Sequence, residues 1–97
     1  NIAEAYSGKE IVYAKSWGSL EHYGNAKEQS KQNSQYKNFI VDEQKMGLTN
    51  DAVFSHCLPL RRNVKATDGV MDSAYCIAVA EAANRKHVQK SILSKIL

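Results

Sequence analysis

Three short apolar runs, separated by polar stretches, predict the strands of a parallel sheet. Residues 11–14 (IVYA) and 52–57 (AVFSHC) are β-favouring runs of the length expected for buried strands. Residues 75–79 (YCIAV) predict a third strand of the same kind. The uninterrupted apolar character of residues 11–14 favours a strand that is covered on both faces.

Helical signals lie before and between the apolar runs. Residues 1–6 have helical composition and are followed by Gly8, which can adopt the left-handed conformation that closes a helix. Asp42 is a candidate N-cap for a short helix over residues 43–48. Residues 67–71 begin with a second capping signal and predict a single turn of helix.

The two longest segments without a strand signal differ in pattern. Residues 16–35 are rich in polar and small residues and predict a long loop. From near residue 81 to the end of the chain, apolar residues recur at spacings of three and four, which predicts a long helix with one apolar stripe. The members of this stripe are Val88, Ile92, Leu93 and Ile96.

The alternation of strands and helices predicts the fold class. It is typical of an α/β fold, with a parallel sheet of about three strands, crossover helices and a long C-terminal helix. Ligands of such sheets gather at the carboxyl ends of the strands. We therefore expect Lys15, Cys57 with Leu58, and the residues after Val79 to form one site.

Composition and charge limit the classes of function. The 97 residues allow one compact domain at most, and 43% hydrophobic and 24% charged residues are ordinary globular values. The net charge of +3 is spread along the chain without a basic arm, which disfavours nucleic-acid binding. No apolar run approaches the roughly 20 residues of a membrane span, so a soluble protein without a membrane partner is expected.

The cysteines and histidines do not form a metal motif. Cys57 and Cys76 belong to no CxxC pair, and two free thiols fit the reducing cytoplasm. The histidines show no metal-ligand spacing to one another or to the cysteines, so no metal and no cofactor are expected. These histidines are His22, His56 and His87.

Residues 54–65 (FSHCLPLRRNVK) form the most specific motif of the chain. The motif resembles the HCLP signature of the aspartate and ornithine carbamoyltransferase superfamily. The segments 14–18 (AKSWG) and 60–68 (LRRNVKATD) resemble the N-acetylornithine or N-succinylornithine branch, because ordinary ornithine carbamoyltransferases usually have SMG where this chain has KSWG. Residues 81–90 (EAANRKHVQK) are similar to the last helix of the family, and only residues 19–35 are poorly matched.

The resemblance implies a fold, an activity and an assembly. Residues 1–97 would be the C-terminal portion of a Rossmann-like ornithine-binding domain. The activity would be transfer of a carbamoyl group from carbamoyl phosphate to N-acetyl-L-ornithine, giving N-acetylcitrulline and phosphate in arginine biosynthesis. A cytoplasmic homotrimer is implied for the full enzyme. The family's S-x-R-T-R and HPxQ motifs do not occur, so we expect the carbamoyl-phosphate domain to be missing and the chain alone to be inactive.

The motif at Cys57 and Leu58 has two interpretations. An X-Pro bond costs only about 0.5–1 kcal/mol to be cis, so the chain can turn sharply at Pro59. The resemblance implies this turn, with the carbonyl groups of Cys57 and Leu58 accepting hydrogen bonds from the carbamoyl NH2 and the attacking amine. The alternative is an ordinary strand end. A Cys57 nucleophile with His56 as its base is disfavoured, because adjacent strand residues point to opposite faces.

Four cationic residues complete the expected site, although each would ordinarily be a solvated surface residue. The resemblance implies that Arg85 meets carbamoyl phosphate and stabilises charge on its carbonyl oxygen. It also implies that Lys15 binds the α-carboxylate of the acylated ornithine and that Arg61 lies near the same substrate. Lys65 would bear a carboxyl group on its side-chain nitrogen. Lysine must be neutral to take up CO2, so this modification requires a lowered pKa from burial or from neighbouring arginines.

Two alternatives for the function stay open. The substrate could be N-succinylornithine or ornithine, because the residues that select the acyl group are expected outside this chain. The chain could also be a non-catalytic α/β module in which Lys15, Arg61 and Arg85 bind a small anion.

Overall fold

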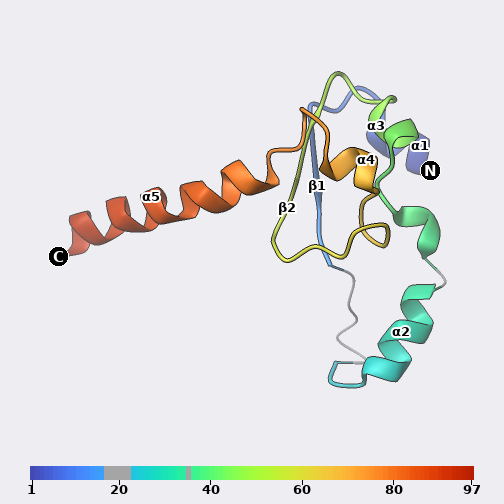
Figure 1. The fold of residues 1–97 in the computed structure, drawn as a ribbon, viewed down its shortest axis with the longest axis horizontal. Helices are drawn as coiled ribbons and strands as arrows, with labels where there is room; N and C mark the ends of the chain where they lie inside the picture. The colour runs from blue at the N-terminus through green and yellow to red at the C-terminus, as the bar shows by residue number, and fades with distance from the viewer. Residues whose placement is uncertain (17–22, 35) are drawn as a thin grey trace.

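Two parallel strands form the centre of the fold (Figure 1). A computed structural model describes residues 1–16, 23–34 and 36–97. Strand β1 (Ile11–Ala14) pairs with β2 (Val53–His56) in a register that places Tyr13 opposite Ser55. The helices are α1 (Ile2–Tyr6), α2 (Ala26–Ser34), the 3-10 helix η1 (Lys37–Phe39), α3 (Glu43–Met46), α4 (Asp68–Met71) and α5 (Ala78–Ile96). None of the helices in these ranges is long and apolar enough to cross a membrane.

The hydrophobic core lies on one face of this small sheet. Phe54 is fully buried, and Val12 and Ala14 of β1 pack against the same cluster. The cluster comprises Val41, Met46, Ala52, Phe54, Ala66 and Val70. The prediction that residues 11–14 are covered on both faces is wrong for the described structure, because Ile11 and Tyr13 are 68% and 55% exposed. Alternate residues of a strand face opposite sides, and the described chain covers only one of them here.

The third predicted strand does not form. Its second residue, Cys76, makes only an isolated parallel bridge to Phe54. The backbone nitrogen of Phe54 donates to the Tyr75 carbonyl (2.9 Å), and that of Ile77 donates to the Phe54 carbonyl (2.8 Å). Helix α5 then begins at Ala78, three residues before the predicted start near residue 81, because Ala78 is buried and the following alanine-rich stretch favours helix. The parallel α/β class itself is confirmed.

The predicted caps of the short helices are confirmed. Asp42 accepts a hydrogen bond from the Lys45 backbone nitrogen (2.8 Å) at the start of α3. Thr67 does the same for Val70 (3.3 Å) at the start of α4. Each bond satisfies a backbone donor that has no partner within its helix, which explains why such short helices begin at these residues.

The polar segment between β1 and α3 contains a helix where a loop was predicted. Helix α2 occupies residues 26–34, and the side chain of Asn25 accepts a hydrogen bond from the Glu28 backbone nitrogen (3.2 Å) near its start. Its sequence, AKEQSKQNS, has no apolar stripe, so the hydrophobic periodicity that reveals most helices is missing. The predicted loop residues 17–22 and 35 lie outside the described residues.

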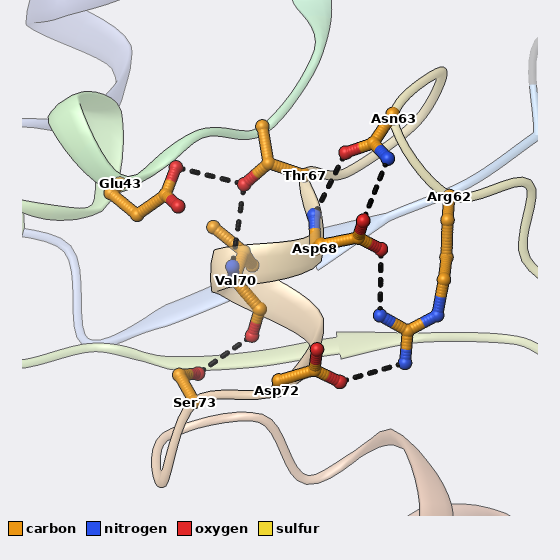
Figure 2. A network of polar contacts seen from close by, with 8 residues as sticks. All are labelled: Glu43, Arg62, Asn63, Thr67, Asp68, Val70, Asp72 and Ser73. Atoms are coloured by element: carbon orange, nitrogen blue, oxygen red, sulfur yellow. Dashed lines mark hydrogen bonds and ion pairs between the residues drawn. The ribbon is translucent and has the colours of Figure 1, made fainter.

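A polar network fastens the segment after the HCLP motif to the core (Figure 2). Arg62 donates to Asp68 (2.9 Å) and to Asp72 (2.8 Å). Asn63, which has a left-handed backbone (φ 59), donates to the Asp68 carboxylate and accepts from the Asp68 backbone nitrogen, both at 2.9 Å. Thr67 also donates to Glu43 of α3 (2.8 Å). Residues 61–68 are therefore tied to both α3 and α4.

Asp68 should make stability depend on pH in the acid range. Hydrogen bonds from Asn63 and then from Arg62 lower its pKa below the ordinary 3.8. Because the fold favours the ionised form, its contribution is complete above that value and is lost as pH falls through the lowered pKa. We expect Asp68→Asn to flatten the acid loss of unfolding free energy as pH falls below about 4, measured by urea titration.

A matched variant separates this network from general acid effects. Asp51 makes no side-chain hydrogen bond within the part of the chain that the structure describes, and its backbone is also left-handed (φ 48). Asp51→Asn should keep the wild-type pH dependence, because asparagine tolerates that conformation. Equal flattening in both variants would contradict the role given to Asp68.

Candidate functional site

The chain turns at the carboxyl end of β2, where the HCLP motif lies. The bond between Leu58 and Pro59 is cis, as the sequence resemblance implied. Cys57 is exposed, and Leu58 is 47% exposed. His56 is buried, and its Nδ1 contacts the carbonyl oxygen of Cys57. The chain thus passes from the buried strand residue His56 to Cys57 and Leu58 at the surface.

A hollow of about 620 Å³ brings together three of the predicted site residues. Cys57 and Leu58 form one wall of it, and Arg85 of α5 forms another. Arg85 reaches this place because Ala78 is buried at the first turn of α5, next to β2. Tyr13, His56 and Glu81 also line the hollow.

A second hollow of about 700 Å³ is lined by Arg61 and Lys65. It lies between these residues and Ser30, Ser34 and Lys37, so three cationic side chains face it. The predicted site residues are therefore divided between two hollows. Lys15 is exposed directly after β1 and belongs to neither lining. It nevertheless lies near Cys57, because each of them follows one member of the register pair Ala14 and His56.

Lys65 is the most unusual cation of the chain. Lys65 is only 4% exposed, and its backbone carbonyl accepts a hydrogen bond from the Val41 backbone nitrogen (2.9 Å). Burial, followed by the charge of Arg61, lowers the pKa of its side-chain amine. Arg62 was expected to act in the same way, but it is directed to Asp68 and Asp72 instead. The environment of Lys65 is therefore of the predicted kind, with burial first and the charge of Arg61 second.

The comparison with protein families identifies the domain. The family model described as aspartate/ornithine carbamoyltransferase, Asp/Orn binding domain, matches residues 1–96. The chain belongs to this family. The resemblance seen in the HCLP motif and the last helix is thereby confirmed, as is the fold class.

Individual relatives are similar over the whole length of the chain. It is 60% identical over 97 residues to the N-acetylornithine carbamoyltransferase of Xanthomonas campestris pv. campestris. This match covers 100% of the chain and 29% of that relative. It is 36% identical over 96 residues to the N-succinylornithine carbamoyltransferase of Bacteroides fragilis. This match covers 97% of the chain and 28% of that relative. The chain thus spans less than a third of the length of these curated relatives.

Solved structures agree with the fold of this carbamoyltransferase domain. Acetylornithine transcarbamylase complexed with acetylcitrulline matches with a TM-score of 0.90 and 60% identity, over 100% of this chain and 29% of that one. A mutant of N-acetyl-L-ornithine transcarbamylase complexed with carbamyl phosphate and N-succinyl-L-norvaline gives the same TM-score, identity and coverage. The backbone of the Asp/Orn binding domain is therefore shared with enzymes that have been observed with these ligands.

The carbamoyltransferase domain also contains site residues that the sequence did not reveal. Ser55, which is 2% exposed, donates a hydrogen bond to Glu81, and Glu81 and Tyr13 line the first hollow. The Nε2 atom of His56 is buried and has no hydrogen-bond partner among the described residues. Strand alternation could have placed Tyr13 and Ser55 on one face, but their register is not readable from one sequence. Within the described ranges, no group of three metal-binding side chains occurs.

The two cysteines of the carbamoyltransferase domain should differ in reactivity. Cys57 is exposed at the hollow, whereas Cys76 is half-buried beside Phe54. Reactivity of a thiol depends on access as well as on thiolate content. We expect iodoacetamide to modify Cys57 faster than Cys76, measured by peptide mass spectrometry over time. Cys57→Ser provides the control that assigns the fast phase, and equal rates at both thiols would contradict this geometry.

Proposed function

We propose that this chain forms the acylornithine-binding half of a carbamoyltransferase active site. In this proposal residues 1–97 are the C-terminal portion of the amino-acid-binding domain, and another domain binds the phosphate of carbamoyl phosphate. The main support is the hollow that unites Cys57, Leu58 and Arg85. The product would be N-acetylcitrulline, since the chain is 60% identical to an N-acetylornithine carbamoyltransferase and 36% identical to an N-succinylornithine carbamoyltransferase.

The reaction needs positioned donors and acceptors more than a nucleophilic side chain. The side-chain amine of the acylated ornithine attacks the carbonyl carbon of carbamoyl phosphate and forms a C–N bond. The C–O bond to phosphate breaks, phosphate leaves with the electron pair, and the proton that the amine loses ends on the departing phosphate. The carbonyl groups of Cys57 and Leu58 orient the carbamoyl NH2 and the amine, while Arg85 stabilises negative charge on the carbonyl oxygen.

The remaining cations are assigned to the amino-acid substrate. Lys15, exposed at the end of β1, binds the α-carboxylate, and Arg61 lies near the same substrate. A lysine suits the first task, because its ammonium group acts as a point charge with three donors. Since Lys15 and Arg61 follow adjacent strands, one extended substrate can contact both sides of the HCLP turn.

Lys65 is proposed to be carboxylated on its side-chain nitrogen. The neutral amine attacks CO2 and loses a proton, which leaves an anionic carbamate. Burial and the charge of Arg61 lower the pKa of Lys65 and so raise the neutral fraction. Arg61 and Lys37, which line the same hollow, would then stabilise the carbamate by charge attraction.

The wider setting of the enzyme is also a proposal. A cytoplasmic homotrimer acting in arginine biosynthesis is supported by the family membership of the chain. The two free cysteines are consistent with a reducing compartment. An N-succinylornithine or ornithine substrate, and a non-catalytic anion-binding module, are the alternatives that an assay must exclude.

A chimera tests the proposed activity. The matching segment of the Xanthomonas campestris enzyme is replaced by this chain, and formation of N-acetylcitrulline from N-acetylornithine, N-succinylornithine or ornithine is measured. We expect activity with N-acetylornithine, and a decrease of kcat/KM by about 10²- to 10³-fold in Arg85→Ala, because one preorganised donor to the oxyanion is lost. Lys86→Ala is the matched control, since the neighbouring Lys86 is exposed and does not line the hollow.

Two outcomes of this assay would reject the proposal. Binding of carbamoyl phosphate without turnover would favour the anion-binding module. Turnover by the chain alone would show that no second domain is needed. Isotope-labelled carbamoyl phosphate allows binding and turnover to be measured in the same samples.

The carboxylation of Lys65 can be observed directly. In 13C-bicarbonate, we expect a carbamate carbon signal by NMR that grows as pH rises through the lowered pKa of Lys65, because only the neutral amine reacts. Lys65→Arg should remove the signal. Lys45→Arg is the control, since the amine of Lys45 already donates to the carbonyls of Asn38 and Ile40 (both 2.6 Å). A signal that persists in Lys65→Arg would place the modification elsewhere.

A further inference from the structure

The carboxylate of Glu81 lies beside two hydroxyl groups from neighbouring strands. Tyr13 of β1 and Ser55 of β2 are register partners, so their side chains share the face of the sheet that is opposite the core. The first turn of α5 adjoins this face, because Ile77 donates to the Phe54 carbonyl and Ala78 is buried. The hydroxyl of Ser55 donates to the Glu81 carboxylate there.

Tyr13 responds to the same carboxylate. Desolvation, followed by the charge of Glu81, raises the pKa of the Tyr13 phenol above its ordinary value. Tyr13 and Glu81 also line the same hollow. Glu81 is thus hydrogen-bonded to Ser55 of β2 and lies close to Tyr13 of β1.

Glu81 would otherwise have an obvious partner on its own helix. Arg85 lies four residues later, and a glutamate that precedes a cation by four residues is the favoured orientation for an ion pair on a helix. Within the described residues the structure contains ion pairs at Lys45 and Arg62 but none between Glu81 and Arg85. Both residues nevertheless line the hollow with Cys57 and Leu58.

We propose that Ser55 and Tyr13 are positioning residues that hold Glu81 away from Arg85, so that the guanidinium stays available for an anionic ligand in the hollow. The identity of that ligand as carbamoyl phosphate rests on the proposed function. The geometry itself depends only on the hydrogen bond of Ser55 and on the register of the two strands.

The physical basis is that Glu81 and an anionic ligand compete for the positive charge of Arg85. An acidic side chain that pairs with Arg85 must be displaced before a phosphate or a developing oxyanion can bind there. A pair of this spacing on a helix surface would weaken binding of the anion by up to about twofold. The hydrogen bond from Ser55 keeps the Glu81 carboxylate from pairing with Arg85. The same bond connects α5 to β2.

The test compares four proteins in the chimera: wild type, Ser55→Ala, Glu81→Gln and Ser55→Ala with Glu81→Gln. In Ser55→Ala we expect KM for carbamoyl phosphate to rise by about twofold, with a smaller change in KM for N-acetylornithine. The double variant should return to the value of wild type, because glutamine has no charge with which to pair Arg85. If the double variant is as impaired as Ser55→Ala, or if Ser55→Ala has no effect, the proposal is wrong.

A second measurement does not depend on turnover. In the chain itself, labelled with 15N-arginine, we expect the Nε–H signal of Arg85 to shift and to exchange more slowly with water in Ser55→Ala than in wild type. The double variant should resemble wild type. An unchanged Arg85 signal in Ser55→Ala would overturn the proposal, whether or not the chimera is active. An inactive wild-type chimera with the expected shift would instead reject only the proposed function.

Discussion

The backbone of Phe54 is the point on which the rest of the structure depends. On one side, β2 pairs with β1, with Val12 opposite Phe54. On the other side, its nitrogen and carbonyl are bonded to Tyr75 and Ile77, while its side chain is fully buried in the core. A buried backbone group without a partner is costly, so satisfying both edges of β2 fixes the approach of the chain into α5. The positions of the HCLP turn and of Arg85 both follow from this constraint.

Two neighbouring arginines in this domain have different tasks. Arg62 is held by two aspartates and stabilises the segment that follows the turn. Arg61 is left beside the buried Lys65 and lowers its pKa. Had Arg61 been paired instead, its charge would have been compensated and the lysine would have been less perturbed. The polar network of Figure 2 thus directs Arg62 to two aspartates, while Arg61 lines the second hollow with Lys65.

Several of these features could be predicted from the sequence, and the reasons for the others are physical. The runs at β1 and β2, the caps at Asp42 and Thr67, and the turn at Pro59 depend on local residue types, and all are present. Helix α2 was missed because a polar helix has no hydrophobic period. The start of α5 was displaced because burial of Ala78 and helix propensity prevailed over a β-favouring run. The contact of Ser55 with Glu81 depends on how a strand and a helix meet in space, which single-sequence patterns do not contain.

The attachment of α5 by its first turn has a mechanical consequence. In Figure 1 the helix extends away from the body, and the apolar stripe residues such as Ile92 and Ile96 are 54% and 72% exposed. At about 1.5 Å per residue, the far end lies almost 30 Å from Ala78, whereas Arg85 lies only about 10 Å away. Tilting the helix by about 10° about its first turn would move its tip by about 5 Å but Arg85 by less than about 2 Å. Arg85 thus lies close to the point about which the helix would tilt, so such a tilt changes the geometry of the hollow little.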